Sequence, residues 1–336
     1  MYSSQIPISS GFGAASTAAD VIKGIDLSNT TAIVTGGYSG LGLETARVLH
    51  AAGSKVIVPT RDRAKAAKAL AGLDGIEIEA MDLLDPASIE AFASRFIETA
   101  RPLNILVNSA GIMVCPLARD ARGYESQFAT NHLGHFQLVK HLLPALRQAN
   151  GARVVSVSSW GHHFSPVVFE DPNFDRRDYD RWSAYGQSKT ANILFTVALD
   201  ARCKAQGVRA FSLHPGTIVG TGLEKHVSVE ELQAAGVIDE QGNRVLDPDR
   251  NLKTVEQGAA TSVWCATSPR LKAMGGLYCE NCDIAPIETD RTGPGWKTGD
   301  STRRAGVMPY AIDAEAAERL WDLSEQLLLG ARHSRF

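Results

Sequence analysis

The stretch 31-TAIVTGGYSGLGLETARVLHAAG-53 combines a short apolar run, a glycine-rich turn and a helical pattern, and it decides the fold. Residues 31–35 are apolar or β-branched without alternation, which is typical of a strand buried on both faces. Residues 41–53 repeat apolar side chains at helical spacing and end at Gly53, so a helix follows the turn. A strand, a tight turn and a helix in this order are typical of the start of a parallel α/β fold.

The same alternation of strand and helix continues along the chain. Further strands are predicted over residues 55–61, 75–83, 103–111, 152–159, 208–216 and 276–280, and further helices over 63–73, 86–100 and 124–146 and from 183 onward. Apolar runs that alternate with helices indicate a parallel sheet covered on both sides. We therefore predict a single-domain α/β fold, a Rossmann-type doubly wound parallel sheet of about seven strands with helices on both faces.

Two long irregular segments interrupt this pattern, at residues 160–181 and 217–253. Such segments after sheet strands usually build a binding site, so both are predicted to be insertions that contact a substrate. The second ends where Thr254 and Gln257 form a capping box for another helix. Since no linker or repeat is present, residues 31–336 are predicted to form one domain, with residues 1–30 as an N-terminal extension packed on it.

Composition excludes several classes of function. Of the 336 residues, 44% are hydrophobic and the net charge is -3, so neither nucleic acid nor an anionic membrane is an expected partner. No run of about eighteen apolar residues predicts a membrane span. The first twenty residues lack a basic region followed by an apolar one, so no secretory signal is expected. Five cysteines, an odd number, indicate reduced thiols and a cytoplasmic location.

The glycine-rich turn predicts the first ligand. Gly36, Gly40 and Gly42 let the backbone turn tightly and let a pyrophosphate approach the free N–H groups at the helix N-terminus. Many glycine patterns are only turns, but this one lies between a strand and a helix at the front of an alternating fold. We therefore predict a dinucleotide-binding domain in which these glycines, Ser39 and Leu41 contact the cofactor.

The end of the second strand, 59-PTRDR-63, indicates which dinucleotide is bound. An acidic residue here binds the ribose 2′-hydroxyl of NAD, whereas an arginine accommodates the 2′-phosphate of NADP. Thr60 stands at the acidic position and Arg61 follows it, and a guanidinium suits phosphate through paired hydrogen bonds. The sequence thus favours NADP over NAD. The alternative is that Arg61, like Arg63, is a solvated residue at the start of a helix, beside the acidic Asp62.

Two further strand ends are predicted to contact the cofactor, because ligands of open α/β sheets bind beyond the carboxyl ends of the strands. Asp82 and Leu83 end the third strand, where the carboxylate could accept a hydrogen bond from the adenine amino group. Asp82 could instead cap the next helix, although Asp85 before Pro86 is better placed for that. The motif 108-NSAG-111 ends the fourth strand and contributes Asn108, Ala110 and Gly111.

Tyr185 and Lys189 indicate the chemistry. They lie four residues apart in 183-SAYGQSKTANILF-195, so a helix brings them to one face. A free tyrosine has a pKa of about 10 and is a poor base at neutral pH, but a nearby ammonium lowers that pKa. A phenol tuned in this way can exchange a proton with a substrate oxygen. Taken alone, the pair could be a surface tyrosine beside a solvated lysine, but the glycine-rich turn upstream favours catalysis.

Together these motifs resemble the short-chain dehydrogenase/reductase family. TGGYSGLG, NSAG, an asparagine in the long fourth helix, VSS, YGQSK and HPG occur in the family's order and spacing over essentially the whole chain. The long interval from serine to tyrosine, SSWGHH and GLYCENCDIA resemble its retinol-dehydrogenase-like branch. The resemblance implies a parallel sheet that binds NAD(P) at its carboxyl edge, and hydride transfer that interconverts a carbonyl and an alcohol.

The resemblance also assigns roles to catalytic residues. Tyr185 is the proton donor or acceptor, and Lys189 tunes it and holds the ribose of the nicotinamide. Ser159, the second serine of VSS, hydrogen-bonds the substrate oxygen, and Ser158 is left a structural role. Asn131 organises a water-linked proton path to the lysine. Because it is polar within an apolar helix, it needs a hydrogen-bonding partner if it is buried.

Residues after the sixth strand complete the implied cofactor site. Pro215 and Gly216 belong to the HPG turn, and backbone groups of Ile218 face the nicotinamide carboxamide. The chain departs from the family's pattern at two positions. Ser109 replaces the second asparagine of NNAG, and the threonine that usually follows the PG pair comes later, at Thr221, which therefore receives no cofactor contact.

Other motifs have simpler explanations. Cys279 and Cys282 form a CxxC, but a zinc site needs a second pair with matching spacing, which the sequence lacks. Two reduced thiols and no metal are therefore expected. His132 and His135 flank the asparagine of the long helix and are interpreted as packed or hydrogen-bonded core histidines.

The substrate is predicted to be an apolar small molecule. The 160–181 segment supplies apolar side chains close to the active-site strand, namely Trp160, Phe164, Val167, Val168 and Phe169. These residues could instead pack the insertion itself. His162 and His163 lie in the same segment, where they either line the pocket or belong to a turn. Retinoids or steroids are suggested by the resemblance only.

Two other functions are compatible with the fold. A cofactor-sensing NADP-binding protein without turnover would have lost Tyr185 or Lys189, and both are present. An epimerase or dehydratase of the extended relatives would carry a GxxGxxG turn, unlike the GxxxGxG pattern here. The resemblance further implies homo-oligomerisation through the long helices.

Overall fold

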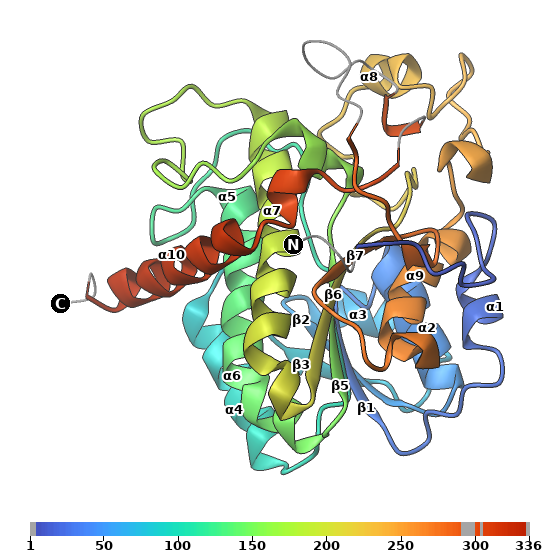
Figure 1. The fold of residues 1–336 in the computed structure, drawn as a ribbon, viewed down its shortest axis with the longest axis vertical. Coiled ribbons are helices and arrows are strands. Elements are labelled where there is room, and N and C mark those ends of the chain that lie inside the picture. The colour runs from blue at the N-terminus through green and yellow to red at the C-terminus, as the bar shows by residue number, and fades with distance from the viewer. Residues whose placement is uncertain (1–4, 290–299, 303–304, 334–336) are drawn as a thin grey trace.

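The computed structural model describes residues 5–289, 300–302 and 305–333 and contains one central sheet (Figure 1). The strand order is β3-β2-β1-β4-β5-β6-β7-β8. The strands are β1 (Thr31–Thr35), β2 (Lys55–Thr60), β3 (Glu77–Ala80), β4 (Ile105–Asn108), β5 (Ala152–Val157), β6 (Val208–His214), β7 (Leu277–Glu280) and β8 (Asp283–Ile284). β1 to β7 run parallel, which confirms the predicted doubly wound sheet.

The eighth strand is a difference from the prediction. β8 pairs with β7 in the antiparallel direction at the edge of the sheet. Asn281 and Cys282 join the two strands and have positive φ angles of 51° and 60°. A two-residue hairpin turn requires such angles to match the twist of its strands. The sequence signal for this hairpin is weak, because the second turn position usually carries glycine and here carries cysteine.

The order of the strands determines where a ligand can bind. The chain starts at β1 in the middle of the sheet, builds β2 and β3 to one side, and then crosses to β4 on the other side. The connections after β1 and β4 therefore leave in opposite directions, which opens a crevice beyond the carboxyl ends of these neighbouring strands. The register places Thr35, the last residue of β1, beside Asn108, the last residue of β4.

Helices cover both faces of the sheet (Figure 1). One face carries α1 (Ala18–Ile22), α2 (Gly40–Ala51) and α9 (Val255–Thr267), and the other carries α4 (Pro86–Glu98), α6 (Gly134–Gln148) and α7 (Arg181–Cys203), while α3 (Arg63–Ala69) follows β2. Each face has its own apolar core. Ile33 of β1 belongs to the core under α4, α6 and α7, and its neighbour Val34 belongs to the core under α1, α2 and α9.

Polar caps fix where several helices begin. Asp85 accepts a hydrogen bond from the backbone at the start of α4, as predicted. Thr254 and Gln257 form the predicted capping box of α9. α7 begins two residues before its predicted start, because Asp180 accepts a hydrogen bond from Ser183 N at 2.7 Å.

The helix predicted over residues 124–146 is continuous but not uniform. It consists of α5 (Ser126–Phe128), a π-helical turn η1 (Ala129–Leu133) and α6. Glu125 begins it by accepting hydrogen bonds from Gln127 N at 2.9 Å and Phe128 N at 2.8 Å. π-helical turns are rare and occur most often at functional sites. Asn131 lies at the centre of this one.

The described part of the N-terminal extension packs against the last strands and α9. Gln5 Nε2 donates hydrogen bonds to the carbonyl oxygens of Tyr278 and Ala285, each at 2.7 Å. Asp283 accepts hydrogen bonds from two backbone N–H groups of the same extension. α1 continues this contact along α9 and α2. The extension therefore covers the edge of the sheet where β7 and β8 lie.

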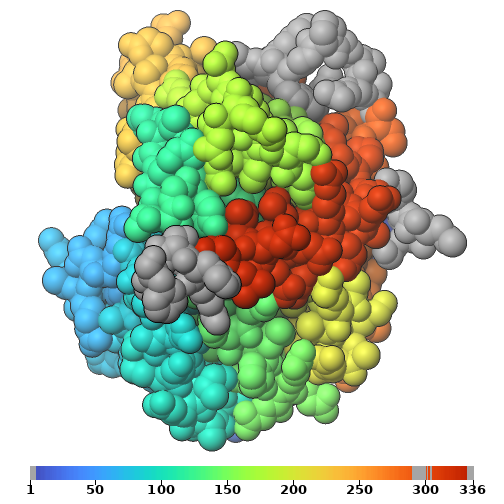
Figure 2. Space-filling view, turned by 90° about the vertical axis from the view of Figure 1, so that its left-hand side faces the viewer, coloured from blue at the N-terminus to red at the C-terminus, as the bar shows by residue number. Residues whose placement is uncertain are grey.

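The last helix, α10 (Ala314–His333), packs on the outer face of α6 and α7, where it crosses one side of the molecule (Figure 2). The ring of Trp321 lies 4.9 Å from that of Phe136 on α6 and 6.1 Å from that of Phe195 on α7. Ion pairs of 2.5 Å flank this contact, namely Lys140–Glu325 and Arg202–Glu318. Part of the outer face of α6 and α7 is thus covered within the chain.

The two irregular segments lie near the carboxyl ends of the strands. Residues 160–181 begin with a short 3-10 helix, η2 (Trp160–Phe164), directly after β5. Residues 217–253 contain α8 (Val229–Ala234), which Figure 1 shows above the carboxyl end of the sheet. Both segments are therefore close to the crevice that the strand order creates.

Candidate active site

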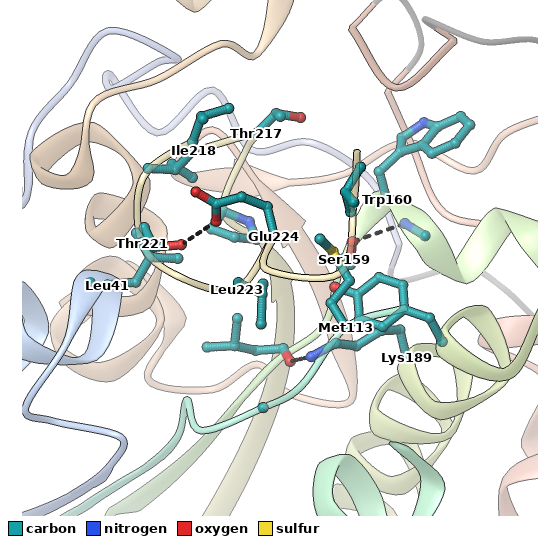
Figure 3. A pocket seen from close by; sticks show the side chains of 18 of the residues that line it. Leu41, Met113, Ser159, Trp160, Lys189, Thr217, Ile218, Thr221, Leu223 and Glu224 are labelled. Atoms are coloured by element: carbon teal, nitrogen blue, oxygen red, sulfur yellow. Dashed lines mark hydrogen bonds between the residues drawn. The ribbon is translucent and has the colours of Figure 1, made fainter. Parts of the chain in front are cut away.

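A cavity of about 850 Å³ lies beyond the carboxyl ends of β1, β4, β5 and β6. Figure 3 shows Leu41 and Ile218 on one side of it and Ser159 and Lys189 on the other. Most of the predicted site residues line it, namely Gly36, Ser39, Gly40, Leu41, Gly42, Ala110, Gly111, Ser159, Tyr185, Lys189, Pro215, Gly216 and Ile218. The fold thus brings together residues that lie up to about 180 positions apart in the sequence.

The glycine-rich turn is packed so closely that side chains do not fit. A Cβ at Gly42 would lie 2.4 Å from the carbonyl oxygen of Gly36, and a Cβ at Gly36 would lie 3.0 Å from Cα of Ala110. Gly36 and Gly40 have φ angles of 68° and 49°, in the region that favours glycine. Ser39 makes no side-chain cap, so the first N–H groups of α2 are free to bind an anion. These residues fit a dinucleotide pyrophosphate.

The NSAG motif is held in place by Thr35 at the end of β1. The Thr35 hydroxyl accepts hydrogen bonds from Ser109 N at 3.0 Å and Ala110 N at 3.1 Å. Asn108 lies beneath the cavity and not in its wall, because its side chain donates a hydrogen bond to Ser156 Oγ on β5 at 3.2 Å. Asn108 therefore supports, from below, the part of the cavity wall that the NSAG motif forms.

Three residues predicted to contact the adenosine end lie outside the cavity wall. Arg61 is exposed, and Leu83 is buried against the first residue of α6. Asp82 accepts a hydrogen bond at 3.0 Å from a backbone N–H two residues further on. Instead, Tyr38 and Lys65 line this end, with Lys65 Nζ 5.8 Å from the centre of the tyrosine ring. Sequence reasoning missed Lys65, although its place in the first turn of the helix after PTRDR is a usable signal.

Tyr185, Lys189 and Ser159 meet on the opposite side of the cavity. Tyr185 and Lys189 lie one turn apart on α7, and Lys189 Nζ is 5.6 Å from the centre of the tyrosine ring. Lys189 Nζ also donates a hydrogen bond to Val157 O on β5 at 3.0 Å. Ser159 caps η2 by accepting a hydrogen bond from Gly161 N at 3.0 Å, and its hydroxyl interacts with the Tyr185 phenol. The three predicted catalytic side chains are thus close together, with Tyr185 and Lys189 buried and Ser159 half-buried.

Burial dominates the pKa values of this group. It raises the pKa of Tyr185 from 10.0 to about 12, and the interaction with Ser159 offsets only part of that rise. It lowers the pKa of Lys189 from 10.5 to about 8. The sequence predicts a lowered tyrosine pKa, but the cost of burying a phenolate outweighs the attraction of the ammonium here. At neutral pH, Tyr185 is therefore a protonated phenol and Lys189 is an ammonium.

Asn131 lies behind the cavity wall and has the partners that its burial requires. Its Oδ1 accepts a hydrogen bond from Ile112 N, and its Nδ2 donates to Ile112 O and Ser188 Oγ, each at 2.9 Å. A Cβ at Gly111 would lie 3.2 Å from Asn131 Oδ1 and 3.6 Å from Lys189 Nζ. The Asn131 amide and the Lys189 ammonium therefore lie close to each other behind Gly111. A water-linked proton path from Asn131 to the lysine requires this proximity.

The turn after β6 packs on a lysine that sequence reasoning missed. A Cβ at Gly216 would lie 2.8 Å from Cδ of Lys253, and Gly216 has a φ of 96°. Lys253 is buried, and its backbone N–H donates a hydrogen bond to Thr217 O at 3.0 Å. Thr221, further along this segment, lines the cavity beside Gly40. The segment after β6 thus closes over the glycine-rich turn, although the usual PG-threonine spacing is absent.

Aromatic rings form the wall on the substrate side. Phe164 lies between two tryptophans, with ring centres 5.5 Å from Trp160 and 5.3 Å from Trp182. Leu232 and Val237, from α8 and the chain after it, line the same cavity. Trp182 is a lining residue that sequence reasoning missed, because it precedes the predicted start of α7.

Three other residues predicted for this wall face elsewhere. Val167 belongs to the apolar core of the molecule, and Phe169 lies under the Arg319 guanidinium of α10 at 4.3 Å. Val168 also lies outside the cavity wall. The 160–181 segment leaves the cavity after Phe164, packs toward α10 and returns to the cavity wall at Asp180.

The four histidines singled out in the sequence and the five cysteines lie outside the cavity wall. His132 and His135 are buried and hydrogen-bonded, and His162 and His163 are buried in η2, outside the cavity wall. All five cysteines are free, buried thiols. Within residues 5–289, 300–302 and 305–333, no group of three or more His, Cys, Asp or Glu side chains is arranged to hold a metal ion. In the same residues, no helix has the length and apolar character needed to cross a membrane.

Comparison with known proteins identifies the family. Residues 30–232 match the model of the short chain dehydrogenase family. The chain belongs to this family. The short-chain dehydrogenase is 46% identical over 311 residues to an oxidoreductase of Streptomyces lividans, covering 90% of this chain and 99% of the relative. It is 35% identical over 310 residues to human retinol dehydrogenase 12, covering 90% and 88%.

A solved structure is also similar along nearly the whole chain. An uncharacterised protein from Mycobacterium paratuberculosis is 34% identical with a TM-score of 0.68, covering 93% of this chain and 97% of the other. The predicted family and its retinol-dehydrogenase-like resemblance are thus confirmed. This short-chain dehydrogenase is an NAD(P)-dependent oxidoreductase that acts on CH–OH groups or the corresponding carbonyls.

Proposed function

We propose that this short-chain dehydrogenase is an NADP-preferring reductase of apolar aldehydes or ketones, with Tyr185 as the proton donor. The observation that carries the proposal is that the buried Tyr185 and Lys189 meet the half-buried Ser159 in the wall of one cavity. A phenol with a pKa of about 12 keeps its proton at neutral pH. It is therefore suited to donate that proton to a carbonyl oxygen as the carbon is reduced.

The cofactor supplies hydride when it is bound, and the residues of the chain would hold it along the cavity. The glycine-rich turn and the free N–H groups of α2 suit its pyrophosphate. The turn of Pro215 and Gly216, with Ile218, lines the cavity after β6 and suits the nicotinamide. Ala110 and Gly111 form the floor between these two ends.

The proton would follow a route made by the chain itself. The Ser159 hydroxyl orients the substrate oxygen toward Tyr185, which donates its proton. The Lys189 ammonium stabilises the phenolate that remains, and this is the form that burial otherwise disfavours. Lys189 then gives a proton to the Tyr185 phenolate and regains one from solvent. Asn131 lies next to Lys189 behind Gly111, where it can organise the water molecules that carry this proton.

The preference for NADP is proposed from the charges at the adenosine end. Asp62 is the nearest acidic residue after β2, and its Oδ1 accepts a hydrogen bond from Lys65 N at 2.9 Å as the cap of α3. That carboxylate is therefore committed to the helix and less able to bind a ribose hydroxyl. Lys65 places an ammonium at the cavity wall, and the exposed Arg61 lies at the end of the neighbouring strand. Two cations favour a 2′-phosphate.

The preference for an apolar substrate is proposed from the aromatic wall of the cavity, on the side away from the glycine-rich turn. Trp160, Phe164 and Trp182 form a continuous aromatic surface that starts at the residue after Ser159. The carboxylates on this side are already engaged, since Asp180 caps α7 and Glu231 pairs with Arg181 at 2.5 Å. A substrate with an apolar body would therefore bind without leaving a charge unpaired.

The test is NADPH oxidation against a panel of apolar aldehydes and ketones, with NADH in parallel. We expect turnover with NADPH that falls at least a hundredfold in Tyr185→Phe while NADPH binding, measured by its fluorescence, is retained. Tyr179→Phe is the matched control, because Tyr179 donates its hydrogen bond to Cys115 O outside the cavity wall. Turnover that survives Tyr185→Phe would refute the assignment of the proton donor.

A second comparison tests the choice of cofactor. Lys65→Glu should raise the KM for NADPH at least about tenfold and leave the KM for NADH nearly unchanged, because only NADP carries the 2′-phosphate. Lys68→Glu is the control, since Lys68 is exposed on the same helix and does not line the cavity. Equal effects of Lys65→Glu on both cofactors would contradict the proposed phosphate contact.

A further inference from the structure

We infer that His162 and His214 are positioning residues that clamp the peptide group between Ser159 and Trp160 and so hold the Ser159 hydroxyl beside Tyr185. The inference deepens the proposed function and rests on it. It concerns two buried imidazoles that lie on different elements and meet at this peptide group, one in η2 and one at the end of β6.

The clamp acts on both ends of one peptide group. The carbonyl oxygen of Ser159 and the N–H of Trp160 belong to the same planar unit. His162 Nδ1 lies 2.7 Å from Ser159 O. Trp160 N donates a hydrogen bond to His214 Nδ1 at 3.1 Å. Ser159 O also accepts a hydrogen bond from the backbone N–H of His162 at 3.1 Å. Rotation of this peptide group would break all three hydrogen bonds at once, so its orientation is fixed.

The neighbours of each ring determine which nitrogen carries the proton. Met308 N donates a hydrogen bond to His162 Nε2 at 3.2 Å, so Nε2 is the acceptor and Nδ1 carries the proton. A protonated Nδ1 is what donation to the Ser159 carbonyl requires. His214 Nδ1 accepts from Trp160 N, so its proton is on Nε2. The clamp therefore needs two neutral imidazoles in opposite tautomers.

Their surroundings keep both rings neutral. His162 packs against His163 and Tyr278, with ring centres 4.2 Å and 5.0 Å away. His214 lies near the Lys253 ammonium and His163, which disfavour another positive charge. Burial lowers the pKa of His214 to about 3 and lowers that of His162 well below its ordinary value. Both rings are therefore neutral at neutral pH.

Stability does not explain the presence of His214. Its Nε2–H is buried and has no hydrogen-bond partner among the residues that the structure describes. A buried donor without a partner costs free energy, and an apolar side chain of similar size would avoid that cost. The contact from Nδ1 to Trp160 N is the benefit that offsets it. Since these two effects on stability are of similar size, the orientation of the peptide group is the main contribution of His214.

The turn of residues 159–161, which contains the clamped peptide group, packs directly against Tyr185. Ser159 Oγ accepts a hydrogen bond from Gly161 N at 3.0 Å, so the orientation of this turn sets the direction of the hydroxyl. A Cβ at Gly161 would lie 2.7 Å from Cε1 of Tyr185, which shows how closely the same turn packs on the ring. A displacement of the peptide group would therefore change the distance between Ser159 and Tyr185.

Four variants distinguish the loss of each hydrogen bond of the clamp from a general loss of stability. His214→Asn places an oxygen where Nδ1 was and keeps the acceptor for Trp160 N, whereas His214→Leu removes it. His162→Asn keeps a donor for Ser159 O, whereas His162→Gln keeps an acceptor for Met308 N and loses that donor. Each pair compares buried side chains of similar size.

The measurements are kcat and KM for carbonyl reduction, NADPH affinity by fluorescence, and the midpoint of urea unfolding. We expect His214→Leu and His162→Gln to lower kcat by about ten- to a hundredfold with NADPH affinity unchanged. Both asparagine variants should keep kcat within about threefold of the wild type. The urea midpoint of His214→Leu should lie close to that of the wild type, because the lost hydrogen bond from Trp160 N offsets the removal of the unpartnered Nε2–H.

Two results would overturn the clamp. One is wild-type kcat in His214→Leu, and the other is a loss of kcat in all four variants that follows their loss of stability. Failure of the proposed function is a separate result, since it appears as turnover that does not depend on Tyr185. A crystal structure of His214→Leu decides the matter without turnover: displacement of Ser159 Oγ supports the clamp, and an unmoved hydroxyl refutes it.

Discussion

The substitution Lys189→Met should make the protein more stable at neutral pH while it abolishes catalysis. Lys189 is buried on α7, and burial lowers its pKa from 10.5 to about 8. At pH 7 the folded protein nevertheless holds the lysine as an ammonium. The energy of keeping that charge in the core is therefore subtracted from the free energy of unfolding.

The magnitude follows from the two pKa values and from one hydrogen bond. The fall of the Lys189 pKa from 10.5 to about 8 corresponds to about 3 kcal/mol that methionine would recover. Methionine also loses the hydrogen bond from Nζ to Val157 O, which contributes about 1 kcal/mol. Val157 O keeps a second donor, since Asn192 Nδ2 lies 3.2 Å away, so it is not left without a partner. The net gain is about 2 kcal/mol.

The gain should depend on pH in a defined direction. Between about pH 8 and 10.5 the unfolded chain binds more protons at this lysine than the folded protein, so wild-type stability from this group rises with pH. The penalty is fully present below pH 8 and is lost as the pH approaches 10.5. The advantage of Lys189→Met should therefore shrink through this range and disappear at its upper end.

Urea unfolding of the two proteins at pH 7 and near pH 10 measures this difference. Lys204→Met is the control, since Lys204 is exposed and its loss should change the midpoint very little. A Lys189→Met variant that is less stable than the wild type at pH 7 would refute the reasoning. An advantage that is independent of pH would also refute it, because the gain would then come from packing and not from charge.

Three further predictions concern other parts of the molecule. Trp321→Ala should lower the free energy of unfolding by about 3–5 kcal/mol, while the exposed Leu329→Ala on the same helix should have little effect in the same urea assay. Gly42→Ala should abolish NADPH binding in a fluorescence titration, because its Cβ would lie 2.4 Å from a carbonyl oxygen of the cofactor turn; retained affinity would contradict this. The kcat/KM for reduction should fall above about pH 8, where Lys189 loses its charge, and a level profile to about pH 10 would argue against its role.

The sequence predicts best the features that depend on neighbours in the chain. The glycine-rich turn, the capping box at Thr254 and the helical pairing of Tyr185 with Lys189 each occupy fewer than ten residues, and local spacing determines them. The parallel sheet follows from the repeated alternation of apolar strands and helices. The fold and most of the residues of the cavity wall can be predicted from these features alone.

Features that depend on packing between distant segments were not accessible in the same way. The rise in the pKa of Tyr185 comes from burial, and no pattern in the sequence gives the depth of a side chain. Lys65 reaches the cavity and Arg61 remains exposed because of where α3 begins, which Asp62 determines as its cap. Phe169 faces α10 because that helix offers a partner 150 positions away.

The position of α10 also has a consequence for how the protein is made. Phe195 on α7 and Trp321 on α10 are 126 positions apart, so the ribosome adds the covering helix long after the helix that it covers. Synthesis proceeds at about 5–20 residues per second, so the apolar face of α6 and α7 stays uncovered for roughly 6–25 s until α10 has been added. During that interval the side chains of Phe136 and Phe195 are accessible to chaperones and to other nascent chains. Translation that stops before α10 would release a product that contains every predicted catalytic residue and yet has an uncovered aromatic surface.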